Sequence, residues 1–228
     1  MPDRTRTSDD PKRLLHLARA IVPRESAAVA AVADQLDESF VRVADALLAC
    51  AGHVLVTGAG TSHAVALRLA HLLSCCGTPA LFIDAGDSQH GLSGAVTGRD
   101  VLIALSKGGE TAEVNHLARI ARKRGATVIA ITEAPASTLG ALSDIVLRVQ
   151  APADVDPYGM IATGSSLVSA ALCDALCVAL LHLRGHSREA FGENHPGGAV
   201  GLRLENSDKQ QSAPSCSPRL LDGGRVCA

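Results

Sequence analysis

Short runs of aliphatic and β-branched residues alternate with helical patterns along the middle of the chain. Two stretches with helical apolar spacing, residues 62–76 and 111–124, separate some of these runs, and Gly125 is a stop signal for the second. Five runs are predicted to be strands: residues 53–56, 80–83, 101–105, 127–131 and 145–149. Because neighbouring parallel strands need crossover helices, this alternation predicts an α/β fold whose parallel sheet is covered on both faces.

Helical patterns also flank this region. Residues 12–50 carry apolar residues at helical spacing, and we expect a break at Pro23, so that two helices precede the sheet. Residues 167–183 are apolar over nearly the length of a membrane span, but Asp174 lies in the middle of this stretch and Arg184 closes it. We therefore interpret the stretch as a buried or interface helix and expect no membrane partner.

The regular pattern stops after Leu204. Residues 205–228 are polar and rich in Pro, Gly and Ser, a composition typical of a disordered tail. The predicted organisation is an N-terminal helical segment over residues 1–50, one α/β domain over residues 51–204 and this tail.

Composition argues against several classes of partner. The 21 basic and 23 acidic side chains show no excess that would attract nucleic acid, and the absence of Trp leaves few surfaces for base stacking. The charged N-terminus lacks the apolar run of a signal peptide, which favours a cytoplasmic protein. Seven cysteines without a Cys-x-x-Cys motif fit reduced thiols, and Cys173 and Cys177 are interpreted as two buried thiols on one helix face and not as metal ligands.

Ligands of open parallel sheets bind beyond the carboxyl ends of the strands, so the loops at those ends form the candidate site. The first loop, GAGTSH, leads into a helix, where Gly60, Thr61 and Ser62 could bind an anion. A dinucleotide fingerprint is an alternative, because Asp84 ends the second run where a ribose-binding acid would lie, but His63 replaces the third glycine. In a plain tight turn, Ser62 would simply cap the helix.

The loop SKGGET at residues 106–111 repeats this arrangement after the third run. Its residues Ser106, Gly108 and Thr111 could bind the same phosphate as the first loop, and Lys107 adds a positive charge. Glu110 could meet a bound sugar, although an acid at this position also suits the first turn of a helix.

Together these loops resemble those of sugar isomerase (SIS) domains, and more narrowly those of arabinose 5-phosphate isomerases. The resemblance covers about residues 50–204 and includes GAGTSH, SQHG at 88–91, SKGGET, PYGMIATGSSL at 157–167 and HPGGA at 195–199. It implies a five-stranded parallel sheet flanked by helices, a flavodoxin-like three-layer arrangement preceded by N-terminal helices. It also implies a phosphorylated sugar held by Ser62, Ser106 and Thr111, with Ser165 and Ser166 of the last loop also binding the substrate.

Isomerases of this kind interconvert an aldose and a ketose phosphate through an enediol. The reaction needs a base at the carbon and acid or base groups at the two oxygens, and the resemblance assigns this work to Glu110, His90, His195 and Asp154. It implies neither a cofactor nor a metal. Because members of the family commonly share sites across subunits, we expect a homodimer or homotetramer in which His195 completes a neighbour's pocket.

Two departures from the family pattern bear on the substrate. Thr61 stands where arabinose 5-phosphate isomerases carry a lysine, and residues 106–110 read Ser-Lys-Gly-Gly-Glu in place of Ser-Asn-Ser-Gly-Glu. One positive charge could have moved between adjacent loops, or the substrate could differ. Many of these isomerases append paired CBS modules, which we do not expect here. A non-catalytic sensor of a phosphorylated sugar and a 3-hexulose 6-phosphate isomerase remain as alternatives.

Overall fold

The computed structural model describes residues 11–197, 201 and 203. The chain divides into two compact units, residues 1–186 and 187–228. The predicted tail at 205–228 and part of the HPGGA motif, residues 198 and 199, lie outside the described residues. The second unit contains one described helix, α7 (Arg188–Glu193), which Ser187 caps by accepting a hydrogen bond from the N–H of Ala190.

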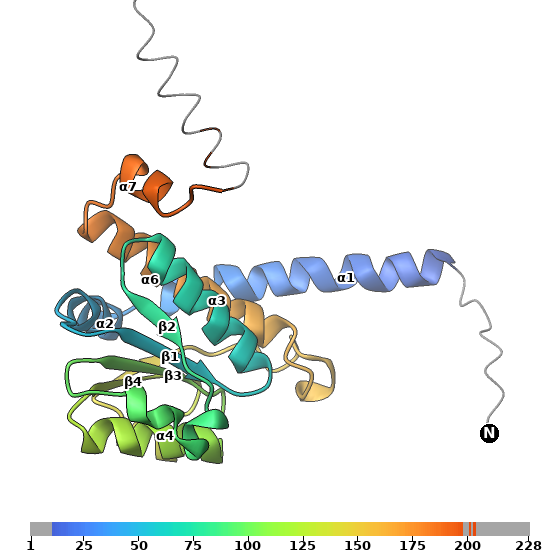
Figure 1. The fold of residues 1–228 in the computed structure, drawn as a ribbon. Coiled ribbons are helices and arrows are strands. Elements are labelled where there is room, and N and C mark those ends of the chain that lie inside the picture. Colours follow the sequence, from blue (N-terminus) through green and yellow to red (C-terminus); the bar gives the residue numbers. More distant parts are fainter. Residues whose placement is uncertain (1–10, 198–200, 202, 204–228) are drawn as a thin grey trace, which may run out of the picture. The chain divides into compact units, whose positions relative to one another are not determined.

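The first unit contains the parallel sheet that the alternating pattern predicted. Its strand order is β2-β1-β3-β4-β5 (Figure 1), and every neighbouring pair is parallel. All residues of β1 and β3 are buried, as expected for strands covered on both faces. The strands are β1 (Val54–Gly58), β2 (Ala80–Phe82), β3 (Val101–Leu105), β4 (Thr127–Thr132) and β5 (Ile145–Arg148).

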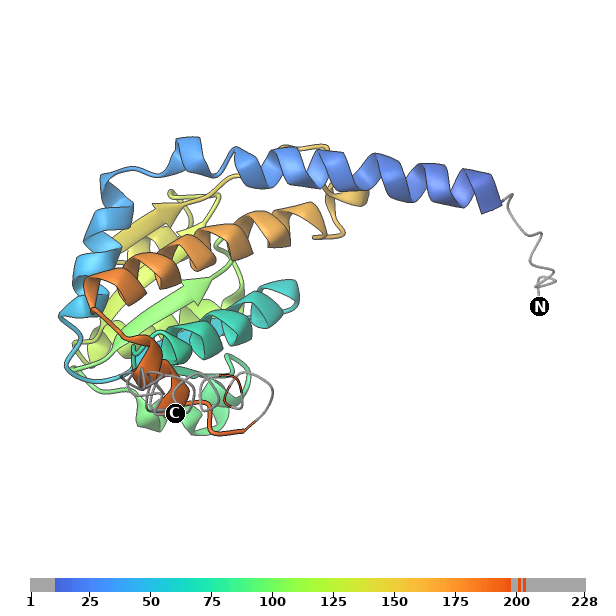
Figure 2. The same ribbon diagram turned by 90° about the horizontal axis from the view of Figure 1, so that it is seen from above.

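Helices cover both faces of this sheet and make the predicted three layers (Figures 1 and 2). On one face lie α1 (Pro11–Ala30), α2 (Glu38–Leu48), α3 (Thr61–Cys75) and α6 (Gly164–Leu183). On the other lie α4 (Ala112–Lys123) and α5 (Thr138–Leu142). Successive strand residues feed opposite cores, so Val56 packs with the first set of helices and Leu55 with the second. Short 3-10 helices occupy the connections at Ala33–Gln35, Asp87–His90, Leu92–Ala95 and Pro157–Gly159.

The expected break at Pro23 is wrong. Helix α1 continues through Pro23, and the two N-terminal helices are separated instead by residues 31–37. Pro23 lies on an exposed part of α1, where water can bind the carbonyl that loses its hydrogen-bond partner. The second helix starts where Asp37 accepts a hydrogen bond from the N–H of Ser39 at 2.8 Å.

Helix α6 is the long apolar stretch predicted from the sequence. Among the described residues it is the helix whose length and composition would allow it to cross a membrane. In the fold it packs along α3 and against α1 and α2, burying Leu172, Leu176 and Leu180 completely or nearly so. Its Asp174 forms an ion pair with Arg68 of α3 through two hydrogen bonds. These contacts are those of a helix that covers a sheet.

The cysteines on this face are free thiols. Cys173 and Cys177 are buried in the core between α6 and its neighbours, and the described residues contain no group of metal-ligating side chains. Burial raises the pKa of the Cys177 thiol to about 12 and that of Cys173 further. Both thiols therefore stay protonated and unreactive at neutral pH.

Candidate active site

A cavity lies at the carboxyl ends of the central strands, in the position predicted for the site. It encloses about 40 Å³, close to the space of one water molecule, which takes about 30 Å³ in the liquid. Hydroxyl groups dominate its polar lining, and the described residues around it include two charged side chains, Lys107 and Glu133. The hydroxyl residues are Thr61, Ser62, Ser106, Thr132, Ser165, Ser166 and Ser169.

A wider hollow adjoins this cavity and shares Thr61, Val65 and Ser166 with it. Its volume is about 430 Å³, and it runs along α3 and α6 to Arg68 and Asp174. The reacting end of a small polar molecule can therefore enter the narrow cavity while the rest of the molecule lies in the hollow.

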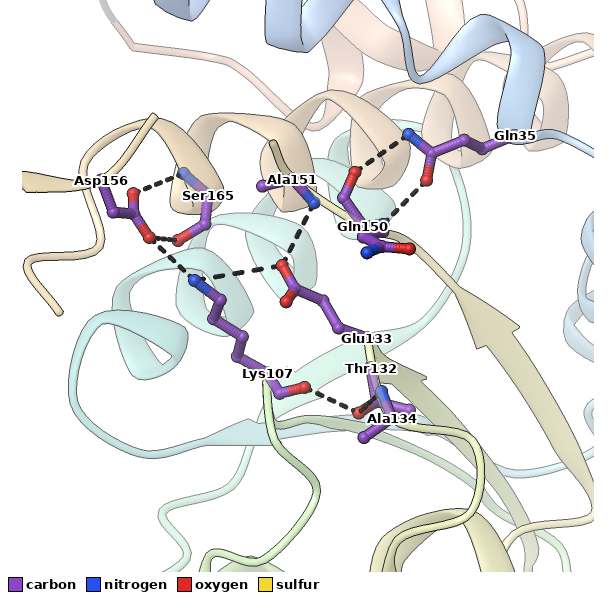
Figure 3. A network of polar contacts seen from close by, with 9 residues as sticks. All are labelled: Gln35, Lys107, Thr132, Glu133, Ala134, Gln150, Ala151, Asp156 and Ser165. Carbon is purple, nitrogen blue, oxygen red and sulfur yellow. Dashed lines mark hydrogen bonds and ion pairs between the residues drawn. The ribbon is translucent and has the colours of Figure 1, made fainter. Parts of the chain in front are cut away.

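Lys107 is held in the cavity by a buried carboxylate. Its ammonium group lies 2.8 Å from Oδ2 of Asp156, whose side chain is 2% exposed (Figure 3). Ser165 donates to the same carboxylate from its hydroxyl at 2.6 Å and from its backbone N–H at 2.9 Å. Burial opposes ionisation of Asp156, but the hydrogen bonds from Lys107 and Ser165 outweigh it and hold the pKa of this carboxyl below its ordinary value.

Glu133 lies on the other side of Lys107 (Figure 3). Its Oε1 is 4.0 Å from the Lys107 ammonium and accepts a hydrogen bond from the N–H of Ala151 at 3.1 Å. The backbone fixes the two residues together, because the Lys107 carbonyl accepts from the N–H of Glu133 at 3.0 Å and from the Thr132 hydroxyl at 3.0 Å. The loops after β3 and β4 are thus joined at the cavity.

The first glycine loop bends as its sequence predicts. Gly60 has a φ of 59° and precedes α3, whose first residues Thr61 and Ser62 line the cavity. A side chain at Gly58 would come within 2.7 Å of the Ser62 carbonyl oxygen, so this turn needs glycine there. His63, at the position of the third glycine of a dinucleotide fingerprint, has its Nδ1 3.5 Å from the carboxylate of Asp84.

The loop after β3 is stabilised by its own hydroxyls. The hydroxyls of Ser106 and Thr111 lie 2.9 Å apart, and Ser106 Oγ accepts from the N–H of Gly109 at 3.1 Å. The Gly109 carbonyl accepts from Asn115 Nδ2 at 3.1 Å and from the N–H of Leu139 at 3.0 Å. Ser106 therefore lines the cavity from a loop anchored to both α4 and α5.

Comparison with known proteins places this architecture in one family. Residues 47–179, more than half of the chain, match the model of the SIS domain. The chain belongs to the SIS domain family. Its sheet and flanking helices agree with that family: an Escherichia coli CFT073 protein, c3406, solved in complex with arabinose 5-phosphate, is 31% identical, with a TM-score of 0.78 over 81% of this chain and 98% of that chain.

Curated relatives of this SIS chain are arabinose 5-phosphate isomerases. KdsD of Pseudomonas aeruginosa is 36% identical over 83% of this chain and 58% of its own length. KdsD of Yersinia pestis is 33% identical over 82% of this chain and 57% of its own length. This chain therefore spans somewhat more than half the length of these relatives.

Not every residue that the SIS resemblance assigned to the site lies at the cavity. Thr61, Ser62, Ser106, Lys107, Ser165 and Ser166 line it. Gly60, Gly108 and Thr111 lie beside it in the two glycine-containing loops. Ser166 Oγ donates to the Thr163 carbonyl oxygen at 2.8 Å, and Ser165 is the partner of Asp156.

The four residues expected to transfer protons are not among those lining the cavity. His90 is exposed at the end of a 3-10 helix, and Asp154 is exposed in the loop after β5. Glu110 turns toward α5, where its carboxylate accepts from the N–H of Thr138 at 2.8 Å and from the Thr138 hydroxyl at 2.7 Å. These bonds hold the pKa of Glu110 below its ordinary value. His195 is in the second unit, where Nδ1 donates to the Phe191 carbonyl oxygen at 2.8 Å and the two rings stack.

Sequence reasoning missed Glu133 and Asp156. Glu133 directly follows β4, so the rule that ligands bind at the carboxyl ends of parallel strands could have identified it. Asp156 carries no such signal, because two acids, Asp154 and Asp156, occupy the same loop and the sequence alone does not say which one is buried.

Proposed function

We propose that this chain catalyses the interconversion of an aldose and a ketose phosphate, with arabinose 5-phosphate as the first substrate to test. The observation that supports this proposal is the cavity at the carboxyl ends of the strands, where seven hydroxyl residues surround one lysine. The curated relatives, which are named arabinose 5-phosphate isomerases, give the reaction class.

The phosphate is proposed to bind between the loops that begin at Gly58 and Ser106. Amide groups at the start of α3 favour an anion, and Ser62 and Ser106 offer hydroxyls on neighbouring strands β1 and β3. The roles of Glu110, His90, Asp154 and His195 in proton transfer stay predictions based on the resemblance. The free, buried thiols support a reducing compartment, and we propose the cytoplasm.

One assay tests the reaction directly. The protein is incubated with a panel of C5 to C7 sugar phosphates, and the exchange between aldose and ketose forms is followed by NMR. Turnover of arabinose 5-phosphate supports the proposal, and turnover of 3-hexulose 6-phosphate alone assigns the alternative isomerase. Binding of a sugar phosphate without any exchange would instead identify a sensor.

The phosphate site gives a separate prediction. Ser62→Ala combined with Ser106→Ala is expected to weaken binding of the sugar phosphate by a few kcal/mol at most, because each hydrogen bond to a charged group contributes about 1.5–3 kcal/mol. Calorimetry measures this loss. Ser143→Ala is the matched control, because the Ser143 hydroxyl donates to the Leu139 carbonyl at the far end of β5 from the cavity. Unchanged affinity in the double variant would locate the phosphate elsewhere.

We also propose that the protein is a homodimer or homotetramer. Apolar side chains of α1 and α6 are exposed in the single chain, including Leu14 at 65%, Val22 at 64% and Val178 at 63%. Apolar side chains that cluster on the surface in this way commonly mark an interface between proteins. Sedimentation is expected to show an oligomer at micromolar concentration, and a monomer under these conditions would contradict the proposal.

A further inference from the structure

Two side chains of opposite charge face the cavity from the ends of neighbouring strands. Lys107 follows β3 by two residues, and Glu133 follows β4 by one. Among the described residues that line the cavity, they are the charged ones; the others are hydroxyl-bearing or apolar. Their side chains are 44% and 26% exposed, so both are shielded by the protein and can still reach a molecule in the cavity.

The protein fixes the position of both groups. Asp156 draws the Lys107 ammonium to one side of the cavity, and the N–H of Ala151 holds the Glu133 carboxylate on the other side (Figure 3). The 4.0 Å between Glu133 Oε1 and Lys107 Nζ is longer than a hydrogen bond, so the two groups are close but not joined. A carboxylate and an ammonium held apart at one small cavity are suited to act on adjacent atoms of one molecule.

We propose that Glu133 and Lys107 are the catalytic base and acid of this site, and that Asp156 is a positioning residue for Lys107. The proposal rests on the proposed isomerase function and assigns the proton transfer to residues of this chain that the family resemblance did not identify.

The proton transfers balance within the pair. The Glu133 carboxylate removes the proton from the hydroxyl-bearing carbon next to the aldehyde, and the Lys107 ammonium gives a proton to the aldehyde oxygen, which yields an enediol. Glu133 then returns its proton to the former aldehyde carbon. The resulting amine of Lys107 takes the proton from the second hydroxyl, so that a ketone forms and both side chains regain their starting states.

Glu110 is the competing candidate for the base. Both oxygens of its carboxylate accept hydrogen bonds from Thr138 at the start of α5, and Glu110 does not line the cavity. The structure thus gives Glu110 a local role in joining two loops, whereas the carboxylate of Glu133 is directed to the cavity.

The test compares the same chemical change at three glutamates. Glu133→Gln, Glu110→Gln and, as the matched control, Glu38→Gln on the exposed first turn of α2 are assayed with the substrate that the wild-type protein turns over. Glutamine keeps an oxygen to accept from Ala151, so the fold should persist, and a thermal melt checks this. The readouts are kcat, KM and the incorporation of deuterium from heavy water at the reacting carbons, measured by NMR.

We expect Glu133→Gln to lower kcat at least about a hundredfold and to stop deuterium incorporation, with KM changed less than about threefold. Glu110→Gln should lose clearly less activity than Glu133→Gln, and Glu38→Gln should match the wild type. A Glu133→Gln variant with a kcat within about threefold of wild type would overturn the pair, as would a larger loss in Glu110→Gln. An inactive wild type would overturn the proposed function itself, which is a different result.

Asp156 needs a readout that a purely structural role would not change. Asp156→Asn keeps the shape and the hydrogen bonds from Ser165 and removes the charge that attracts Lys107. We expect kcat to fall about tenfold or more while KM and the melting temperature change little. Equal changes in kcat and in the melting temperature, or an unchanged kcat, would show that Asp156 does not act through Lys107.

Discussion

Gly109→Ala is expected to destabilise the protein by about 2–5 kcal/mol. Gly109 has a φ of 68°, and its added Cβ would lie 1.9 Å from Ser137 Oγ and 2.5 Å from Ser137 Cβ. A left-handed backbone costs an ordinary residue about 1–2 kcal/mol, and overpacking adds about 1–3 kcal/mol. The loop would have to move away from α5, which would also break the bond from the N–H of Leu139 to the Gly109 carbonyl.

Denaturant unfolding measures this effect, with Gly108→Ala as the matched control. An added Cβ at Gly108 meets no atom within 4 Å, and Gly108 is not among the residues with positive φ. Its free energy of unfolding should therefore stay within about 1 kcal/mol of wild type, because only the entropy of the unfolded chain changes. Equal effects of the two substitutions would mean that the loop is not held against α5 as described.

The sheet could be predicted because its strands are buried on both faces. Residues 101–105, for example, are a continuous apolar run that solvent never reaches, so burial alone defines the strand. The N-terminal helices were harder, because Pro23 is a strong local signal whose effect depends on whether water reaches the carbonyl it leaves unpaired. That exposure is a property of the whole fold.

The candidate site shows the same division. The loops after β1 and β3 could be found from their glycines and hydroxyls, and the structure brings Ser62 and Ser106 to one cavity. The partner of Lys107 could not be found, because Asp156 lies 49 positions away and no local spacing relates the two. Glu110 illustrates the reverse error, since its place in the motif suggested the cavity but its side chain turns to Thr138.

The largest loss of activity is expected from Lys107→Ala. Negative charge develops on the substrate oxygens as the enediol forms, and an ammonium group aimed at them stabilises the transition state more than the bound substrate. Turnover should fall by about three orders of magnitude, within the range of about 10²–10⁴ for a group that transfers a proton. Kinetic assays with the substrate of the wild-type protein measure this loss.

This variant also leaves the buried carboxylate of Asp156 without its ion-pair partner, and a fall in stability must be separated from a loss of catalysis. The cost should be about 1–3 kcal/mol, less than for a fully buried pair, because the Lys107 side chain is 44% exposed. Adding Asp156→Asn to Lys107→Ala removes the unpaired charge and should restore the melting temperature without restoring turnover. Recovery of turnover together with stability would mean that Lys107 acts only on the fold.

A lysine returned to the first loop tests whether the two positions serve the same charge. Thr61 lies in the first turn of α3 and lines the same cavity as Lys107, so Thr61→Lys combined with Lys107→Ala should recover about tenfold of the lost turnover. Recovery should remain partial, because Asp156 holds an ammonium that comes from β3 and is not placed to orient one from α3. If Thr61→Lys restored nothing while the sugar phosphate still bound with wild-type affinity, the lysine of the third loop would serve a different atom of the substrate from a lysine in the first.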